Sequence, residues 1–93
     1  MIEFTDWAAD ILRRSDEAAR RFNPDARVRL FRSGTGVRFA LTDRAEPGDR
    51  TVADHGFELY VEDGIDGLVD VVEPHDQLVL KPLGSAPNPR EHH

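Results

Sequence analysis

Two histidines and one carboxylate lie in turns where they could bind a metal ion. His55 precedes Gly56, and His75 precedes Asp76. Imidazole and carboxylate groups are suitable ligands for Fe(II), Zn or Mn. However, polar residues also gather in turns for structural reasons, and two histidines twenty residues apart do not have the spacing of a dedicated site. We therefore expect no cofactor, and keep a mononuclear metal site at His55, His75 and Asp76 as an alternative.

Four arginines on neighbouring segments form a second candidate site. They are Arg27, Arg29, Arg32 and Arg38. Guanidinium groups bind carboxylates and phosphates through paired hydrogen bonds, so these residues could hold an anion, a small molecule or an acidic partner. The competing interpretation, which we favour, is a solvated sheet face on which the arginines pair with Glu58 and Glu62 across the strands.

The sequence shows no arrangement typical of an enzyme. It contains no cysteine, which excludes disulfides, thiolate catalysis and Cys-ligated metals. The Ser-Gly-Thr-Gly run at residues 33–36 lacks the lysine and the following helix of a phosphate-binding P-loop. No serine has a recognisable His/Asp arrangement around it. We expect a protein that is not an enzyme.

Length and charge limit the possible classes further. The 93 residues carry a net charge of −6, with ten arginines against nine acidic residues in 1–50 and two basic against nine acidic residues in 51–93. An acidic chain is a poor nucleic-acid binder. No stretch approaches the ~20 apolar residues that span a membrane, and the start does not resemble a signal peptide. We expect a cytoplasmic protein that binds neither nucleic acid nor membranes.

One amphipathic helix is predicted near the start of the chain. Apolar and small residues recur there at spacings of three and four: Ala8, Ile11, Leu12, Ser15, Ala18, Ala19 and Phe22. Thr5 is a good N-cap, and Pro24 ends the segment. The opposite face is expected to be solvated and carries Arg13, Arg14, Asp16, Glu17, Arg20 and Arg21.

Short strands are predicted after this helix. Apolar residues alternate with polar ones in residues 27–42, with glycines in the middle, which indicates a hairpin. Further strands are expected at 51–53, 57–61, 69–72 and 77–80, with one helical turn at 63–68 that points Ile65 and Leu68 inward. We expect one domain at 1–83 and a loose tail at 84–93, in which Glu91, His92 and His93 are typical of a purification tag.

The order of several segments resembles the HesB-like family, the A-type iron–sulfur carrier (IscA-like) proteins. The matching segments are residues 4–8 (FTDWA), 28–34 (VRLFRSG), 46–49 (EPGD), 56–61 (GFELYV) and 69–72 (VDVV). The resemblance covers nearly the whole chain. It implies an α+β, mainly β fold of two small sheets of short strands, with one N-terminal helix and a short second helical turn.

The family holds its cluster with three cysteines, and none is present here. One family cysteine lies in a turn that reads Ser33-Gly34-Thr35-Gly36 in this chain, which places Thr35 at a degenerate ligand position. The other two belong to a C-terminal Cys-Gly-Cys-Gly motif that does not occur. A threonine hydroxyl stays protonated and is a hard donor, so it cannot replace a thiolate. The resemblance therefore implies a cysteine-less accessory module of iron–sulfur biogenesis that contacts another protein or a second copy of itself.

Overall fold

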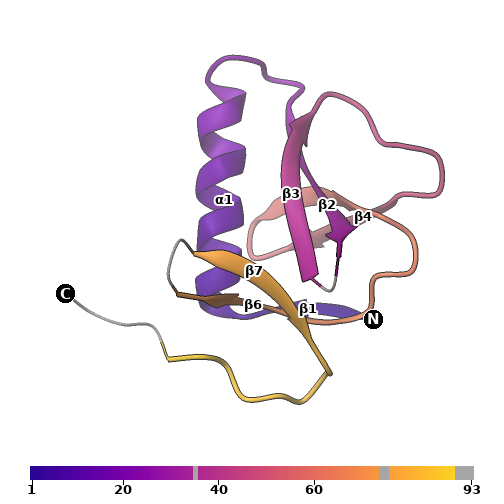
Figure 1. Cartoon of the computed structure of the whole chain (residues 1–93). Coiled ribbons are helices and arrows are strands. Elements are labelled where there is room, and N and C mark those ends of the chain that lie inside the picture. The colour runs from indigo at the N-terminus through magenta and orange to yellow at the C-terminus, as the bar shows by residue number, and fades with distance from the viewer. Residues whose placement is uncertain (35, 74–75, 90–93) are drawn as a thin grey trace.

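The computed structural model describes residues 1–34, 36–73 and 76–89, and places one helix beside two small β-sheets (Figure 1). The helix, α1, spans Asp6–Arg20. The strands are β1 (Ile2–Phe4), β2 (Arg27–Ser33), β3 (Gly36–Thr42), β4 (Arg50–Asp54), β5 (Phe57–Val61), β6 (Gly67–Val72) and β7 (Gln77–Lys81). The α+β, mainly β class is confirmed. Within the described ranges, no helix combines the length and the apolar character needed to cross a membrane.

Helix α1 begins where the sequence predicts. The Oγ1 atom of Thr5 accepts a hydrogen bond from the backbone N–H of Ala8 at 3.2 Å, which satisfies one of the free donors of the first turn. Leu12 is fully buried. The prediction that Asp16 is solvated was wrong, because this residue is only 3% exposed and its Oδ2 lies 3.1 Å from Nε of Arg20. The helix packs against strands of both sheets, β1, β2 and β6. The buried face of the helix is therefore wider than the row of apolar residues and includes Asp16.

The four-stranded sheet has the order β3-β2-β5-β4. The antiparallel β2–β3 pair runs from Arg27 opposite Thr42 to Ser33 opposite Gly36, which confirms the predicted hairpin. Strand β5 pairs with β2 in parallel and with β4 antiparallel. Four fully buried residues, Val28, Leu30, Leu59 and Val61, form the centre of the core on the inward face of this sheet.

The three-stranded sheet has the order β1-β6-β7 and so contains the first and the last strand of the chain as described. Strand β1 pairs with β6 in parallel, and β7 pairs with β6 antiparallel. The backbone N–H of Thr5 donates to the carbonyl of Val69 at 3.0 Å, so the start of α1 is fixed to β6. Val69 and Val71 are fully buried. Because β6 lies between two strands and under α1, a polar residue on it cannot reach solvent easily.

The helical turn predicted at residues 63–68 is not present. Gly64 and Gly67 have φ values of +87° and +129°, which are incompatible with a right-handed helix. The backbone N–H of Gly67 instead donates to the carbonyl of Met1 at 3.0 Å and begins strand β6. Ile65 and Leu68 are nevertheless buried, as predicted, at 0% and 7% exposure. The apolar pattern was interpreted correctly, but the glycines impose a turn and a strand.

Candidate functional site

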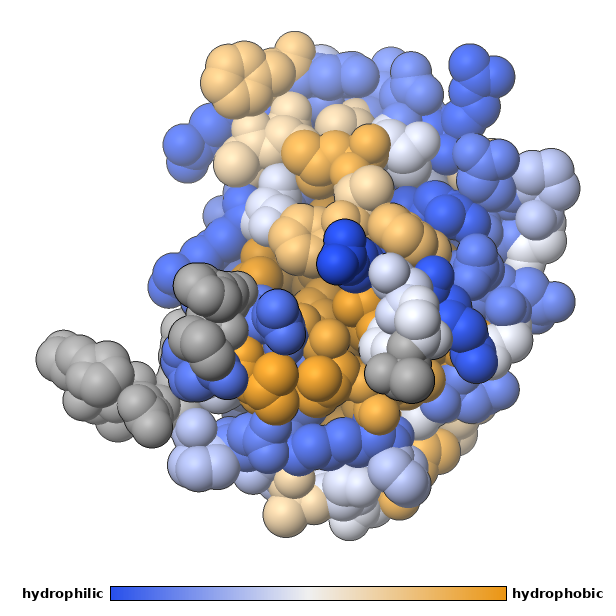
Figure 2. Space-filling model, viewed as in Figure 1, coloured by the Kyte–Doolittle hydropathy of each residue, from blue (hydrophilic) through white to orange (hydrophobic). Residues whose placement is uncertain are grey.

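A groove lies between β3 and β7, each of which ends the strand order of its sheet. It is a hollow of about 510 Å³, and we call it the β3–β7 groove. Its lining residues are Ser33, Gly36, Val37, Arg38, Phe39, Asp76, Gln77, Leu78 and Val79. Figure 2 shows that apolar side chains gather in the middle of this face of the molecule, where the surface is hollowed.

The floor of the groove is apolar and its two walls are strands. Val37 and Leu78 are 3% and 8% exposed, and Phe39 is half-buried. A Cβ atom on Gly36 would lie 3.5 Å from the carbonyl oxygen of Leu78, so the two strands approach closely at that end. The sides of β3 and β7 that face away from their sheet partners carry backbone groups that can pair with another strand.

The position that the resemblance would equate with a cluster ligand is near the groove residues in the sequence. Thr35 itself is outside the described residues. Ser33 and Gly36, on either side of it, both belong to the groove lining.

Arg38 is the basic residue of the groove. It is exposed, and it lies directly opposite Phe31 in the β2–β3 register. Asp76 also belongs to the lining, but no ion pair joins the two side chains. Among the described residues, no carboxylate forms an ion pair with Arg38. Because Arg38 alternates with Val37 and Phe39 along β3, its side chain leaves the strand on the other face, so its guanidinium is available to a partner at the rim of the groove.

Arg29 is not available, because it is bound to carboxylates of the same chain. Its Nε and Nη2 atoms donate to the two carboxylate oxygens of Asp49 at 2.8 and 3.1 Å. Glu62 lies 3.6 Å from Nη2, as the cross-strand interpretation predicted, whereas no ion pair among the described residues joins Glu58 to an arginine. The hydrogen bond from Arg29 holds the pKa of Asp49 below its ordinary value, although burial acts in the opposite direction. This pair fixes the loop before β4 onto the outer face of the sheet.

The remaining two arginines also have intramolecular partners. Arg27 donates to the carbonyl of Ala26 at 2.9 Å, and Arg32 donates to the carbonyl of Gly64 at 3.0 Å. In the strand, Arg32 alternates with Phe31 and therefore points to the other face from Arg29. The four arginines do not form one anion site. Arg38 is the one of the four for which the described residues provide neither an ion pair nor a side-chain hydrogen bond.

The proposed metal ligands belong to turns of different sheets. His55 lies in the turn between β4 and β5, with a φ of +50°, and Asp76 lies at the end of the β6–β7 turn, with a φ of +48°. His75 is outside the described residues. In the described part of the chain, no group of three His, Cys, Asp or Glu side chains is placed to hold a metal ion.

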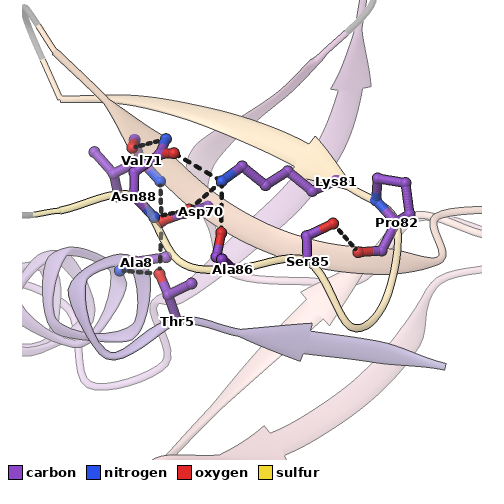
Figure 3. A network of polar contacts seen from close by, with 9 residues as sticks. All are labelled: Thr5, Ala8, Asp70, Val71, Lys81, Pro82, Ser85, Ala86 and Asn88. Atoms are coloured by element: carbon purple, nitrogen blue, oxygen red, sulfur yellow. Dashed lines mark hydrogen bonds and ion pairs between the residues drawn. The ribbon is translucent and has the colours of Figure 1, made fainter.

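A buried carboxylate that the sequence analysis did not single out lies on β6, the middle strand of the three-stranded sheet (Figure 3). Asp70 on β6 is 0% exposed. Its oxygens accept hydrogen bonds from Lys81 Nζ at 2.8 Å, Thr5 Oγ1 at 3.1 Å and the backbone N–H groups of Asn88 and Val71 at 2.7 and 2.8 Å. Burial acts to raise the pKa of Asp70, but these hydrogen bonds together lower it below the ordinary value.

The same network fixes the segment that follows β7, so the prediction of a loose tail was wrong at Asn88. The Nδ2 of Asn88 donates to the carbonyl of Val71 at 2.9 Å, and its Oδ1 accepts from Lys81 at 2.8 Å. Lys81 also donates to the carbonyl of Ala86 at 3.0 Å. Residues 90–93 lie outside the described ranges. The signal in the sequence was an acidic residue inside an apolar strand, together with the only lysine of the chain.

A second hollow lies between the end of α1 and β3. It measures about 450 Å³, and we call it the Phe22 notch. Its lining residues are Ala19, Phe22, Asn23, Ala26, Leu41, Thr42 and Asp43. The prediction that Phe22 continues the buried stripe of the helix was wrong, because α1 ends at Arg20 and Phe22 is 92% exposed.

Comparison with known proteins does not assign this chain to a family. No protein-family model matches it, and a search of curated proteins found no significant match.

Proposed function

We propose that this chain is a cysteine-less HesB-like domain that has no enzymatic activity and acts as an accessory protein-binding module related to iron–sulfur biogenesis. The β3–β7 groove is its binding surface. The observation that carries the proposal is the position of the groove: two residues that flank position 35 line it, and no residue of the chain can supply a thiolate. The order of the matching segments and the arrangement of one helix with two mixed sheets support the same proposal.

Loss of cluster binding follows from ligand chemistry. Iron in such clusters is bound by deprotonated sulfur, and a thiol with a pKa of about 8.5 supplies it once a metal lowers that pKa. Hydroxyl groups do not ionise in this range. Anaerobic incubation with ferrous iron and sulfide, followed by desalting, should leave a protein without the visible absorption of a cluster. A stable cluster at one per chain or per dimer would refute this part of the proposal.

The groove has the features of a site for an extended protein segment. It offers strand edges on both sides, an apolar floor at Val37 and Leu78, and one cation without an intramolecular carboxylate partner, Arg38. An added strand gains affinity from main-chain hydrogen bonds and specificity from side-chain pockets. The partner segment should therefore carry apolar side chains and a carboxylate that meets Arg38.

Site-specific photo-crosslinking in the source cells tests this binding surface. A photoreactive residue at Gln77, which is exposed in the groove, should yield one defined adduct. The same residue at Thr51, which is exposed on β4 at the far edge of the four-stranded sheet, is the matched control. Arg38→Glu should remove the Gln77 adduct. Equal adducts at both positions, or an adduct that is insensitive to Arg38→Glu, would contradict the proposal.

The alternatives lack comparable support. A mononuclear metal site requires several convergent ligands, whereas the described residues provide no such group. An anion site on the sheet requires several arginines that converge, whereas Arg29 is bound to Asp49 and Arg32 points to the other face of the strand. Neither alternative is carried by an observation of its own.

A further inference from the structure

Two apolar residues that the sequence pattern places in the core are exposed around one hollow. Phe22 is 92% exposed and Leu41 is 54% exposed. Both line the Phe22 notch, together with the buried residues Ala19 and Ala26. A single exposed apolar side chain is ordinary, but two beside a hollow lined by further apolar residues are typical of an interaction surface.

Their exposure has a clear cause in the fold. Helix α1 ends at Arg20, and Phe22 lies in the following turn, where its backbone N–H donates to the carbonyl of Ala19 at 3.1 Å. On β3, exposure rises along the inward-facing row, from Val37 at 3% to Leu41 at 54%. The helix packs mainly on β2, and at this end of β3 a hollow separates Leu41 from Ala19 of the helix. In the single chain, the apolar side chains of Phe22 and Leu41 therefore remain exposed to solvent.

We propose that a second copy of this chain covers the notch, with Phe22 of each copy inserted into the notch of the other. The projecting ring and the hollow belong to the same surface, which is the requirement of a two-fold symmetric contact. This inference concerns a hollow other than the β3–β7 groove, so it stands or fails separately from the proposed function.

The charges around the notch are complementary to those of a second copy. Arg21, beside Phe22, is exposed, and Asp43 is exposed in the lining of the notch. Asp43 has only a distant contact of 3.9 Å with Arg44, and both side chains are well exposed. Because Arg21 adjoins Phe22 in the chain, we expect a two-fold axis that exchanges the two phenylalanines to bring Arg21 of each copy toward Asp43 of the other. An unrelated partner would need such a charge pattern of its own, whereas a second copy already provides it.

The test is sedimentation velocity of the full chain at increasing protein concentration. The wild type should show a monomer–dimer equilibrium, and Phe22→Ser should weaken the dimer about tenfold or more, because truncated aromatic anchors dominate such interfaces. Phe22 is almost fully exposed, so the melting temperature of the diluted monomer should not change. Leu83→Ser, at a residue that is 46% exposed outside the notch, is the matched control and should leave the equilibrium unchanged.

Charge-reversal variants test whether Arg21 of one copy contacts Asp43 of the other. Arg21→Asp and Asp43→Arg should each weaken self-association, since each places like charges together across the axis. An equal mixture of the two variants should restore it, because both contacts of the mixed dimer then join opposite charges. A chain that stays monomeric, a dimer insensitive to Phe22→Ser, or a mixture that fails to associate would overturn the proposal. Dimer loss with an unchanged Gln77 crosslink would separate this surface from the β3–β7 groove.

Discussion

Asp70 and Lys81 form an ion pair between neighbouring strands, with 2.8 Å between Oδ2 and Nζ, and the Asp70 side chain is fully buried. In the β6–β7 register Asp70 lies opposite Val79 and Leu68 lies opposite Lys81, so the two charged residues are diagonal neighbours on one sheet face. Thr5, the N-cap of α1, donates to the same carboxylate. One side chain therefore connects the start of the helix, the sheet and the segment after β7.

The first prediction concerns the stability of this network. Asp70→Asn keeps the shape of the side chain but replaces an acceptor oxygen by a donor that faces the amine of Lys81 and the backbone N–H of Asn88. Breaking a buried, hydrogen-bonded charge pair costs about 3 kcal/mol. Urea denaturation at neutral pH should show a loss of this order in the free energy of unfolding.

The matched control for that measurement is Glu17→Gln. Glu17 is a helix carboxylate, 57% exposed, whose contact with Arg13 is 3.5 Å long. Exposed ion pairs of this kind contribute little, so the change should stay within about 0.5 kcal/mol. Comparable losses for the two variants would show that Asp70 has no special role.

The second prediction is a dependence of stability on acid pH. The pKa of Asp70 is lowered in the folded chain, so the unfolded chain takes up the proton first as pH falls. The stabilisation is therefore complete above about pH 5 and is lost progressively as pH falls through the ordinary carboxyl pKa of about 3.9 toward the lower pKa of the folded chain. Urea denaturation across this range should give a steeper loss for the wild type than for Asp70→Asn. Parallel pH profiles would contradict the assignment; Asp49, whose pKa is also lowered, contributes equally to both proteins.

The third prediction concerns the segment after β7. Asn88→Ala removes two side-chain hydrogen bonds, one to Val71 and one from Lys81, each worth about 1 kcal/mol. Backbone amide exchange in residues 82–88 should accelerate about tenfold or more, since this segment then opens locally. Asn23→Ala, at the end of α1, is the control and should leave that exchange unchanged. Unchanged protection in the Asn88 variant would show that other contacts hold the segment.

Much of the architecture could be predicted because it depends on period. Apolar spacing of three and four predicted α1, and alternation predicted the β2–β3 hairpin, since burial of one face determines both patterns. The end of the helix was less predictable: Phe22 fits the stripe, yet the chain turns before it. Apolar periodicity indicates which side chains favour burial. It does not determine which of these side chains are buried in the folded chain.

The site residues were harder to predict because they depend on partners distant in sequence. Arg29 was expected to pair with Glu58 or Glu62, but its hydrogen-bonded partner is Asp49, twenty residues away. The role of Asp70 depends on Lys81 and Asn88, which only the β6–β7 pairing brings near. A local pattern cannot identify such contacts, since they follow from strand order and register.

The last prediction tests the glycine that the sequence analysis placed in a helical turn. Gly67 has a φ of +129°, and a Cβ atom there would collide with the backbone carbonyl of Lys81. Gly67→Ala should therefore destabilise the chain by about 2 kcal/mol or more, from backbone strain and from displacement of β7. Gly84→Ala is the matched control, because its φ is +86° but nothing lies within 4 Å of the added atom; it should cost only about 1 kcal/mol. Thermal or urea denaturation of the two variants measures the difference, and equal losses would mean that the close approach of β6 and β7 at Gly67 is not required.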